Sequence, residues 1–258
     1  MQDLSVLTVQ ANQIWENKEK NFENYERLLA DVAVADLILL PEMFQTGFTM
    51  NSAELAESME QESLLWLKKM SEKKKAAIYT SLIIKDNERY FNRGIFMKPN
   101  GEYSIYDKRH LFGLAGEDKY FTAGSQKTIV EYLGWKINLQ VCYDLRFPEN
   151  SRNRMINDQA EFDLLLYVAN WPERRIQHWS SLLLARAIEN QCYVIGVNRV
   201  GLDANNLNYN GKSVVIRPIG EIISNHLENS ESVEHTLLNA SDLKETRVKL
   251  PFLKDVTF

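Results

Sequence analysis

One cysteine of this chain, Cys142, stands where a predicted strand gives way to a predicted helix. The residues before it, Trp135–Val141, alternate large apolar with polar side chains, as a half-buried strand does, and Pro148 suits the first turn of a helix. A cysteine at such a junction can lie in a cleft near helix N–H groups, which stabilise a thiolate. Cys142 is therefore a candidate nucleophile, although buried free cysteines are also common core residues.

Two further candidates for chemistry follow predicted strands. An uninterrupted apolar run at 37–40 leads into Glu42, and the strand-like segment 103–106 leads to Lys108 in a basic loop. Ligand-binding and catalytic groups of α/β proteins gather at the carboxyl ends of strands. We therefore expect Glu42, Lys108 and Cys142 to form one site.

The elements that must position these residues alternate between strands and helices. The expected strands are 4–10, 36–40, 76–84, 90–97, 102–106, 127–133, 135–141, 162–168, 192–200, 213–217, 221–224 and 232–238. The expected helices are 17–32, 63–75, 149–157 and 178–190, with a last helix whose capped start is Asp242. This alternation predicts a layered α/β fold with mixed sheets. It leaves open whether one doubly wound sheet or two packed sheets are formed.

Composition restricts the class of protein. The chain has 258 residues and no break in composition, which predicts a single domain over 1–258. A net charge of −5 argues against a nucleic-acid partner, and the lysines at 68–69 and 73–75 are interpreted as the solvated face of a helix. No apolar run is long enough to cross a bilayer, and the first residues lack a signal-peptide pattern. We expect a soluble cytoplasmic protein with no membrane partner.

Neither cysteine is expected to form a disulfide in such a protein. Cys192 lies inside an apolar strand pattern and is predicted to be a core residue. A Cys-His protease is disfavoured, because His110 belongs to the basic loop of Lys108 and His178 opens a helix. No His, Cys or carboxylate spacing predicts a metal site, and no cofactor is expected.

Four blocks of the sequence together resemble the nitrilase superfamily, the carbon–nitrogen hydrolases. Three of them are similar to its catalytic signatures in order and spacing: Pro41-Glu42, Asp107-Lys108-Arg109-His110-Leu111-Phe112 and Cys142-Tyr143-Asp144-Leu145-Arg146-Phe147-Pro148-Glu149. The fourth, Asn170-Trp171-Pro172 followed by 185–201, is similar to the stretch after the nucleophile in its amidases. The resemblance extends from the first strand to about Ile223, nearly the whole chain.

This resemblance implies the fold and the assembly. The fold it implies is a four-layer α-β-β-α sandwich of two mixed sheets. It also implies a homodimer or higher homo-oligomer, in which the C-terminal segment 240–258 docks on the partner. Apolar residues near the end favour docking over a frayed tail, because exposed apolar clusters usually mark an interface; they are Phe252, Leu253, Val256 and Phe258.

The resemblance also implies a role for each candidate. Cys142 attacks an amide carbon, and Glu42 takes the thiol proton and later activates water. Lys108 and the backbone N–H of Tyr143 hold the oxyanion. Glu117, counted back from the glycine that follows it, occupies the place of a second glutamate that orients the lysine and substrate. Asp118, one residue on, is the alternative to Glu117, and a surface acid is the other interpretation.

For the residues that would bind the substrate, the sequence leaves alternatives open. Arg146 resembles the carboxylate-binding arginine of the carbamoylases, and the alternative is a structural ion pair with Glu149. Aromatic residues near the motifs either line a narrow pocket or belong to the core; they are Phe44, Phe48, Phe112 and Trp171. The blocks look most like the bacterial ω-amidase group, which implies a 2-oxo dicarboxylic acid monoamide, 2-oxoglutaramate or 2-oxosuccinamate, as the small-molecule substrate.

Several alternatives stay open at this point. A deaminated-glutathione amidase performs the same chemistry on a longer acid, and a nitrile, N-carbamoyl or aliphatic amide hydrolase uses the same nucleophile on another bond. A scaffold protein is disfavoured because all three candidate catalytic residues are present. A redox protein is disfavoured because Cys192 is a poor bridging partner for Cys142.

Overall fold

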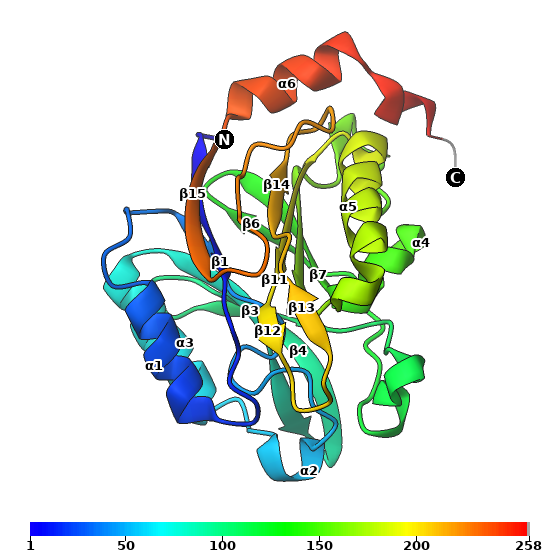
Figure 1. Ribbon diagram of the computed structural model, residues 1–258. Coiled ribbons are helices and arrows are strands. Elements are labelled where there is room, and N and C mark those ends of the chain that lie inside the picture. Colours follow the sequence, from blue (N-terminus) through cyan, green and yellow to red (C-terminus); the bar gives the residue numbers. More distant parts are fainter. Residues whose placement is uncertain (257–258) are drawn as a thin grey trace.

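Two β-sheets face each other at the centre of the molecule, with helices on their outer sides (Figure 1). The computed structural model describes residues 1–256. The six-stranded sheet has the order β15-β1-β2-β3-β4-β5. Its strands are β1 (Leu4–Gln10), β2 (Leu37–Leu39), β3 (Ala77–Asp86), β4 (Arg89–Met97), β5 (Tyr103–Asp107) and β15 (Ser232–Leu238). The five-stranded sheet has the order β14-β11-β10-β7-β6. Its strands are β6 (Ile129–Tyr132), β7 (Trp135–Val141), β10 (Leu164–Ala169), β11 (Tyr193–Asn198) and β14 (Val214–Ile216).

Helices cover the outer face of each sheet. Two pack on the six-stranded sheet, α1 (Lys18–Leu28) and α3 (Glu62–Lys74), and α5 (Ile176–Asn190) packs on the five-stranded sheet (Figure 1). Shorter helices are α2 (Ser52–Leu55) and α4 (Pro148–Ser151), and α6 (Ala240–Lys249) crosses one end of the sandwich near both termini. The predicted α-β-β-α sandwich with two mixed sheets is confirmed.

The alternation of side chains along each strand explains why two sheets pack together. In β2, Leu37 and Leu39 point into the layer between the sheets, whereas Ile38 packs beneath α1 and α3. Successive side chains of a strand point to opposite faces of the sheet, so each apolar strand contributes side chains to two packed layers. The Tyr79 hydroxyl donates to the carbonyl oxygen of Gln140 at 2.9 Å, which joins the two sheets directly.

Strand direction brings the candidate residues to one edge. β2 runs parallel to β3, and β5 runs in the same direction because β4 is antiparallel to both of its neighbours. β7 and β10 are likewise parallel in the second sheet. Glu42 and Lys108 follow β2 and β5, and Cys142 and Asn170 follow β7 and β10, so all four lie beyond carboxyl ends of strands.

Two helix predictions differ from the structure. The helix predicted at 149–157 is only the four residues of α4, and it is followed by the hairpin of β8 (Met155–Ile156) and β9 (Gln159–Ala160). Asn157 and Asp158 form its turn with φ of 49° and 60°, the left-handed pair that a tight hairpin requires. Similarly, the helix predicted at 17–32 ends at Leu28.

The last helix is capped from elsewhere in the chain. It begins at Ala240, so Asp242 lies in its first turn and is not the cap that was predicted. Asp3 supplies the missing acceptor, because its Oδ1 accepts from the Ala240 N–H at 2.8 Å. A contact between residues this far apart in sequence leaves no local signal.

Two strand predictions also change. The segment 192–200 stops pairing in its sheet at Asn198, and β12 (Val200–Leu202) then forms a separate hairpin with β13 (Asn208–Asn210). The predicted strand 221–224 makes only an isolated bridge between Ile216 and Ile222.

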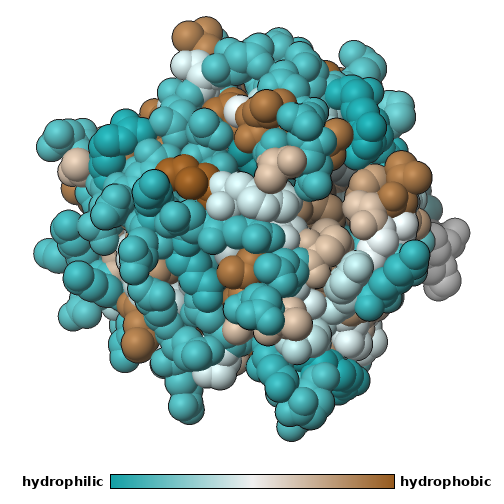
Figure 2. Space-filling view, turned by 60° about the horizontal axis from the view of Figure 1, so that its bottom comes forward, coloured by the Kyte–Doolittle hydropathy of each residue, from teal (hydrophilic) through white to brown (hydrophobic). Residues whose placement is uncertain are grey.

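The face shown in Figure 2 is largely hydrophilic with small hydrophobic patches, and no helix among residues 1–256 has the length and apolar character of a membrane span.

Candidate active site

The Glu42 carboxylate is completely buried and is held by three donors. Its Oε1 accepts from Lys108 Nζ at 2.9 Å and from Asn92 Nδ2 at 2.8 Å, and its Oε2 accepts from the backbone N–H of Asn170 at 2.9 Å. The Glu42 carbonyl oxygen also accepts from the Asn170 and Gln13 side-chain amides at 2.6 and 2.8 Å. These contacts occupy both lone pairs of Oε1 and leave one on Oε2 for an incoming proton.

Lys108 lies between two carboxylates. Its Nζ donates to both oxygens of Glu117 at 2.9 Å as well as to Glu42, and the Phe48 ring lies 5.1 Å from Nζ. Burial alone would lower the pKa of Lys108, but the charges of Glu117 and Glu42 outweigh it and raise that pKa. Lys108 therefore stays an ammonium throughout the physiological range.

Glu117, and not Asp118, is the second carboxylate of the site. Glu117 is fully buried and accepts from the Phe112 N–H at 2.6 Å, whereas Asp118 is exposed. Burial raises the pKa of Glu117, the ammonium of Lys108 opposes this, and the charge of Glu42 adds to it. The site thus packs two carboxylates around one ammonium, where each depends on the lysine for its charge balance.

Asn92 is a site residue that the sequence did not reveal. It lies in β4, and its Nδ2 donates to Glu42 at 2.8 Å and to Glu117 at 3.1 Å. Its amide nitrogen therefore bridges two of the three carboxylate oxygens that Lys108 contacts. The only local signal is a polar residue among the buried positions of a strand, a feature shared by many structural asparagines and, in β4, by the buried Arg93.

Cys142 occupies a strained turn at the end of β7. Its φ is +46°, an uncommon value for a residue with a side chain, and it begins the short 3₁₀ helix η3 (Cys142–Arg146). The Sγ atom lies 3.9 Å from the carbonyl oxygen of Asn170. Burial raises the pKa of the Cys142 thiol, the Glu42 carboxylate raises it further, and Lys108 lowers it. The resting sulfur is therefore a protonated thiol.

Asp144 fixes this turn against the strand that carries Lys108. Its carboxylate accepts from the Tyr106 hydroxyl at 2.9 Å and from the N–H groups of His110 and Val141, both at 3.0 Å. His110 also stacks on Phe147, with ring centroids 3.7 Å apart. His110 thus belongs to the scaffold between the two motifs, in agreement with the rejection of a Cys-His protease.

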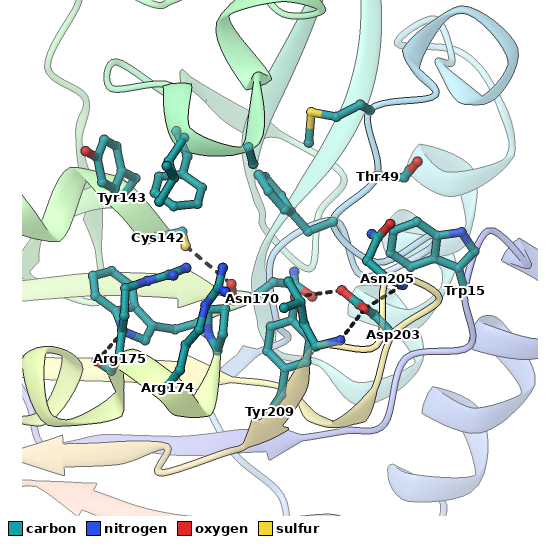
Figure 3. Close-up of a pocket in the computed structure, with 18 of the residues that line it drawn as sticks. Trp15, Thr49, Cys142, Tyr143, Asn170, Arg174, Arg175, Asp203, Asn205 and Tyr209 are labelled. Carbon is teal, nitrogen blue, oxygen red and sulfur yellow. Dashed lines mark hydrogen bonds between the residues drawn. The ribbon is translucent and has the colours of Figure 1, made fainter.

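A cavity of about 470 Å³ opens above Cys142 (Figure 3). Tyr143, Phe112 and Trp171 line it, as does Phe48. Phe44 does not: it packs with Phe22, Tyr25 and Trp66 beneath α1 and α3, so its side chain belongs to the core and not to the pocket. The far side of the cavity is formed in part by the β12–β13 hairpin, which the sequence did not predict.

Arginines gather on the Cys142 side of this cavity. Arg146, Arg174 and Arg175 line it, and Figure 3 shows the last two near Cys142 and Tyr143. Within residues 1–256 none of the three forms an ion pair, so the alternative pairing of Arg146 with Glu149 is absent there. Burial lowers the pKa of Arg175, and the positive charges of Arg174 and Arg146 lower it further. The surroundings of this cluster favour a bound anion.

The arrangement combines a thiol, a carboxylate with one free lone pair, and a permanent ammonium beneath an anion-attracting cavity. Cys192 is fully buried away from the cavity as a free thiol, as expected of a core residue. Such a set can carry out nucleophilic attack on a carbonyl carbon with proton transfer and oxyanion stabilisation. In the part of the chain that the structure describes, no cluster of three His, Cys, Asp or Glu residues could hold a metal ion.

Comparison with known proteins gives concordant matches over most of the chain. The carbon-nitrogen hydrolase family model matches residues 6–248. The omega-amidase YafV of Yersinia enterocolitica is 42% identical over 255 residues, which are 99% of this chain and 97% of that protein. The 2-oxoglutaramate amidase of Bacillus subtilis is 33% identical over 225 residues, 86% of this chain and 85% of that one. The crystal structure of XC1258 from Xanthomonas campestris, a CN-hydrolase superfamily protein with an arsenic adduct in its active site, has 40% identity and a TM-score of 0.97, covering 100% and 98% of the two chains.

Proposed function

This chain belongs to the carbon–nitrogen hydrolase family, and we propose that it hydrolyses the terminal amide of a small 2-oxo dicarboxylic acid monoamide. The substrates proposed are 2-oxoglutaramate and 2-oxosuccinamate, and the products are the 2-oxo dicarboxylic acid and ammonia. The observation that carries the proposal is the buried contact of Lys108 with Glu42 beneath a cavity lined by Cys142 and by Arg146, which forms no ion pair within residues 1–256. The relatives named omega-amidase and 2-oxoglutaramate amidase support the same substrate class.

The first half of the reaction forms a thioester. The sulfur of Cys142 attacks the amide carbon while its proton passes to the free lone pair of Glu42 Oε2. The carbonyl oxygen becomes an oxyanion, which accepts from the N–H of Tyr143 in the first turn of η3 and from Lys108 Nζ, where it replaces one of the two contacts with Glu117. The carbon–nitrogen bond then breaks, Glu42 gives its proton to the leaving nitrogen, and ammonia departs.

The second half releases the acid. A water molecule attacks the thioester carbon and gives a proton to Glu42, and the same two donors hold the new oxyanion. The carbon–sulfur bond breaks, and the departing sulfur regains the proton from Glu42. One amide and one water thus yield one carboxylic acid and one ammonia, with every group of the enzyme restored. Glu117 and Asn92 keep Lys108 and Glu42 in place through both halves.

The arginine cluster gives the site its preference for an acid. A carboxylate at the far end of the substrate binds Arg146, whose planar guanidinium suits bidentate recognition. Arg174 and Arg175 add positive charge to the same side of the cavity. Phe112 and Trp171 wall the chain of the substrate between the reacting amide and this carboxylate.

The extent of the cavity lining favours a second candidate substrate, a longer peptide-like acid amide of the deaminated-glutathione type. The lining extends beyond the arginines to Trp15, Thr49 and Asn205 on the opposite side (Figure 3). A substrate that filled both sides would make contacts that a five-carbon acid cannot reach. The two candidates share the chemistry at Cys142 and differ only in the part of the substrate that lies far from the amide.

The assembly proposed is a homodimer formed through α5. Leu184 and Ile188 on this helix and Ile219 and Ile222 beside it are exposed, and the backbone at Gly220 lies close to both α5 residues. A contiguous apolar patch of this kind suits a self-complementary interface. Replacing Ile188 with aspartate should then convert the dimer to monomers in light scattering, and an unchanged mass would exclude this surface.

Two further proposals concern the C-terminal segment and the location. The segment 240–258 docks on the partner: Phe252 is 58% exposed, whereas Leu253 is buried in its own chain, and Phe258 lies outside the described residues. Removal of 251–258 should therefore weaken the dimer. The enzyme works in the cytoplasm, because chemistry at Cys142 needs a reduced thiol and reducing compartments preserve one.

Ammonia release by the purified enzyme and by a Cys142→Ala variant tests the function. The substrates compared should be 2-oxoglutaramate, 2-oxosuccinamate, glutamine, a peptide-like keto acid amide, simple aliphatic amides and a nitrile. Cys142-dependent activity that is highest on the 2-oxo acid amides is expected. Higher kcat/KM on the peptide-like amide would favour the second candidate, and higher kcat/KM on uncharged amides or nitriles would exclude both.

A further inference from the structure

Among residues 1–256 no acidic residue binds the Arg146 guanidinium, yet other side chains surround it. Its Cζ lies 4.7 Å from the centroid of the Trp171 ring and 5.8 Å from the centroid of the Tyr143 ring. His178 completes the surroundings, because its Nδ1 is 3.2 Å from both Nη1 and Nη2 of Arg146. Two aromatic rings and one imidazole nitrogen thus surround the guanidinium and restrict its movement.

The chemistry of arginine determines the state of His178. A guanidinium has five N–H donors and no acceptor. The His178 Nδ1 must therefore be the acceptor of both hydrogen bonds, with Nε2 as the donor atom of the ring. Both hydrogen bonds come from the Nη1/Nη2 fork, which leaves the Nε–H and the neighbouring Nη2–H of Arg146 free. That second edge is the one that can hold a carboxylate in bidentate fashion.

We propose that His178 is a positioning residue for substrate recognition, holding Arg146 so that its Nε/Nη2 edge receives the carboxylate of the substrate. This inference rests on the proposed function. His178 lies on α5 and is not part of the cavity lining, so it acts through Arg146 and not on the substrate itself.

A neutral partner is well suited to this task. An aspartate or glutamate on Arg146 would fix the guanidinium equally well, but it would cancel the positive charge and compete with the substrate carboxylate. An imidazole acceptor orients the guanidinium and leaves its charge available.

Two substitutions at position 178 separate positioning from folding. His178→Asn keeps an acceptor atom near the place of Nδ1, whereas His178→Leu removes it. Because His178 is exposed, both proteins should fold. Freeing a long side chain that must be immobilised again on binding should raise KM for 2-oxoglutaramate about three- to tenfold in His178→Leu. His178→Asn should stay close to the wild-type KM.

The substrates provide the second comparison. Only anionic substrates use Arg146, so His178→Leu should leave kcat for 2-oxoglutaramate and kcat/KM for an uncharged aliphatic amide within about twofold. Gln177→Leu, which places the same side chain on the adjacent exposed position of α5, should leave all of these values unchanged. Circular dichroism and melting temperature confirm that the variants are folded.

Three outcomes would overturn the inference. They are an unchanged KM for 2-oxoglutaramate in His178→Leu, an equal loss on anionic and uncharged amides, and a His178→Asn variant as impaired as His178→Leu. Failure of the proposed function looks different, because the wild-type enzyme itself would then show no preference for anionic ω-amides. A wild-type preference that persists unchanged in His178→Leu would refute only the role of His178.

Discussion

Replacing Glu42 with glutamine should make the Cys142 thiol easier to alkylate and, at the same time, make the enzyme slower at amide hydrolysis. Burial raises the pKa of the Cys142 thiol, and the Glu42 charge raises it further against the opposing Lys108 ammonium. Without that negative charge the ammonium remains, so the thiol pKa falls and alkylation by iodoacetamide extends to lower pH. Amide turnover falls at the same time, because no group is left to carry the proton from the thiol to the leaving ammonia.

The contacts of Glu42 give the size of each effect. In Glu42→Gln the side-chain oxygen can still accept from Lys108 and Asn92, but the new NH₂ group faces the N–H of Asn170. This unmatched buried donor costs about 1–3 kcal/mol of stability, with roughly 2–4 °C of melting temperature lost per kcal/mol. Lys108 stays in place, because Glu117 binds it through two contacts of 2.9 Å. Loss of the proton carrier lowers kcat about 10²- to 10⁴-fold, or roughly 3–5 kcal/mol.

The assay compares the pH dependence of alkylation, followed by mass spectrometry of the Cys142 peptide, with kcat for ammonia release. Glu57→Gln is the matched control, since Glu57 is also buried and accepts twice from Ser63 at 2.8 Å, yet lies outside the cavity lining. It should lose stability and keep the wild-type alkylation profile. An alkylation profile that moves to higher pH in Glu42→Gln, or a kcat within tenfold of wild type, would refute the reasoning.

Four further predictions concern the residues around Glu42. Lys108→Gln should lower kcat about 10²- to 10³-fold with little change in KM, because it removes an oxyanion donor; an effect confined to KM in steady-state kinetics would contradict this role. Asn92→Ala should lower kcat about tenfold to a hundredfold, the value of a hydrogen bond to a buried charge, and rapid-quench ammonia assays should place the loss in the chemical step. The raised pKa of Glu117 means that it gains a proton at a pH above the ordinary value of about 4.3. As the pH is lowered, kcat/KM should therefore begin to decrease before pH ~4.3 is reached. A pH profile of kcat/KM that stays flat down to pH ~4 would speak against this. Since the pKa of Lys108 is also raised, its ammonium should cause no alkaline loss of activity below about pH 10.4.

Much of the fold could be predicted because the informative patterns are local. The predicted strands 4–10, 135–141 and 232–238 coincide with β1, β7 and β15, since apolar side chains at every second position record which face of a strand is buried. Glu42, Lys108 and Cys142 could be placed together because each follows a strand whose carboxyl end reaches the same edge. The choice of two packed sheets over one came from the family resemblance, which the structure confirms.

The features that escaped prediction depend on contacts between distant segments. Asn92 looks like any polar residue of a strand until Glu42 and Glu117 are brought against it in space. The cap of α6 is Asp3, from the opposite end of the chain. Phe44 lies two residues after Glu42 in the sequence, but its ring packs in the core beneath α1 and α3. None of these partners can be inferred from neighbouring residues.

The central claim, that Cys142 forms a thioester with the acyl part of a 2-oxo dicarboxylic acid amide, is tested most directly by trapping that species. The enzyme is mixed rapidly with 2-oxoglutaramate, quenched in acid, digested and analysed by mass spectrometry. The account predicts a 2-oxoglutaryl group on the Cys142 peptide that hydroxylamine removes and that is absent from Cys142→Ala. Undiminished ammonia release by Cys142→Ala, or an acyl group attached to a different residue, would contradict it.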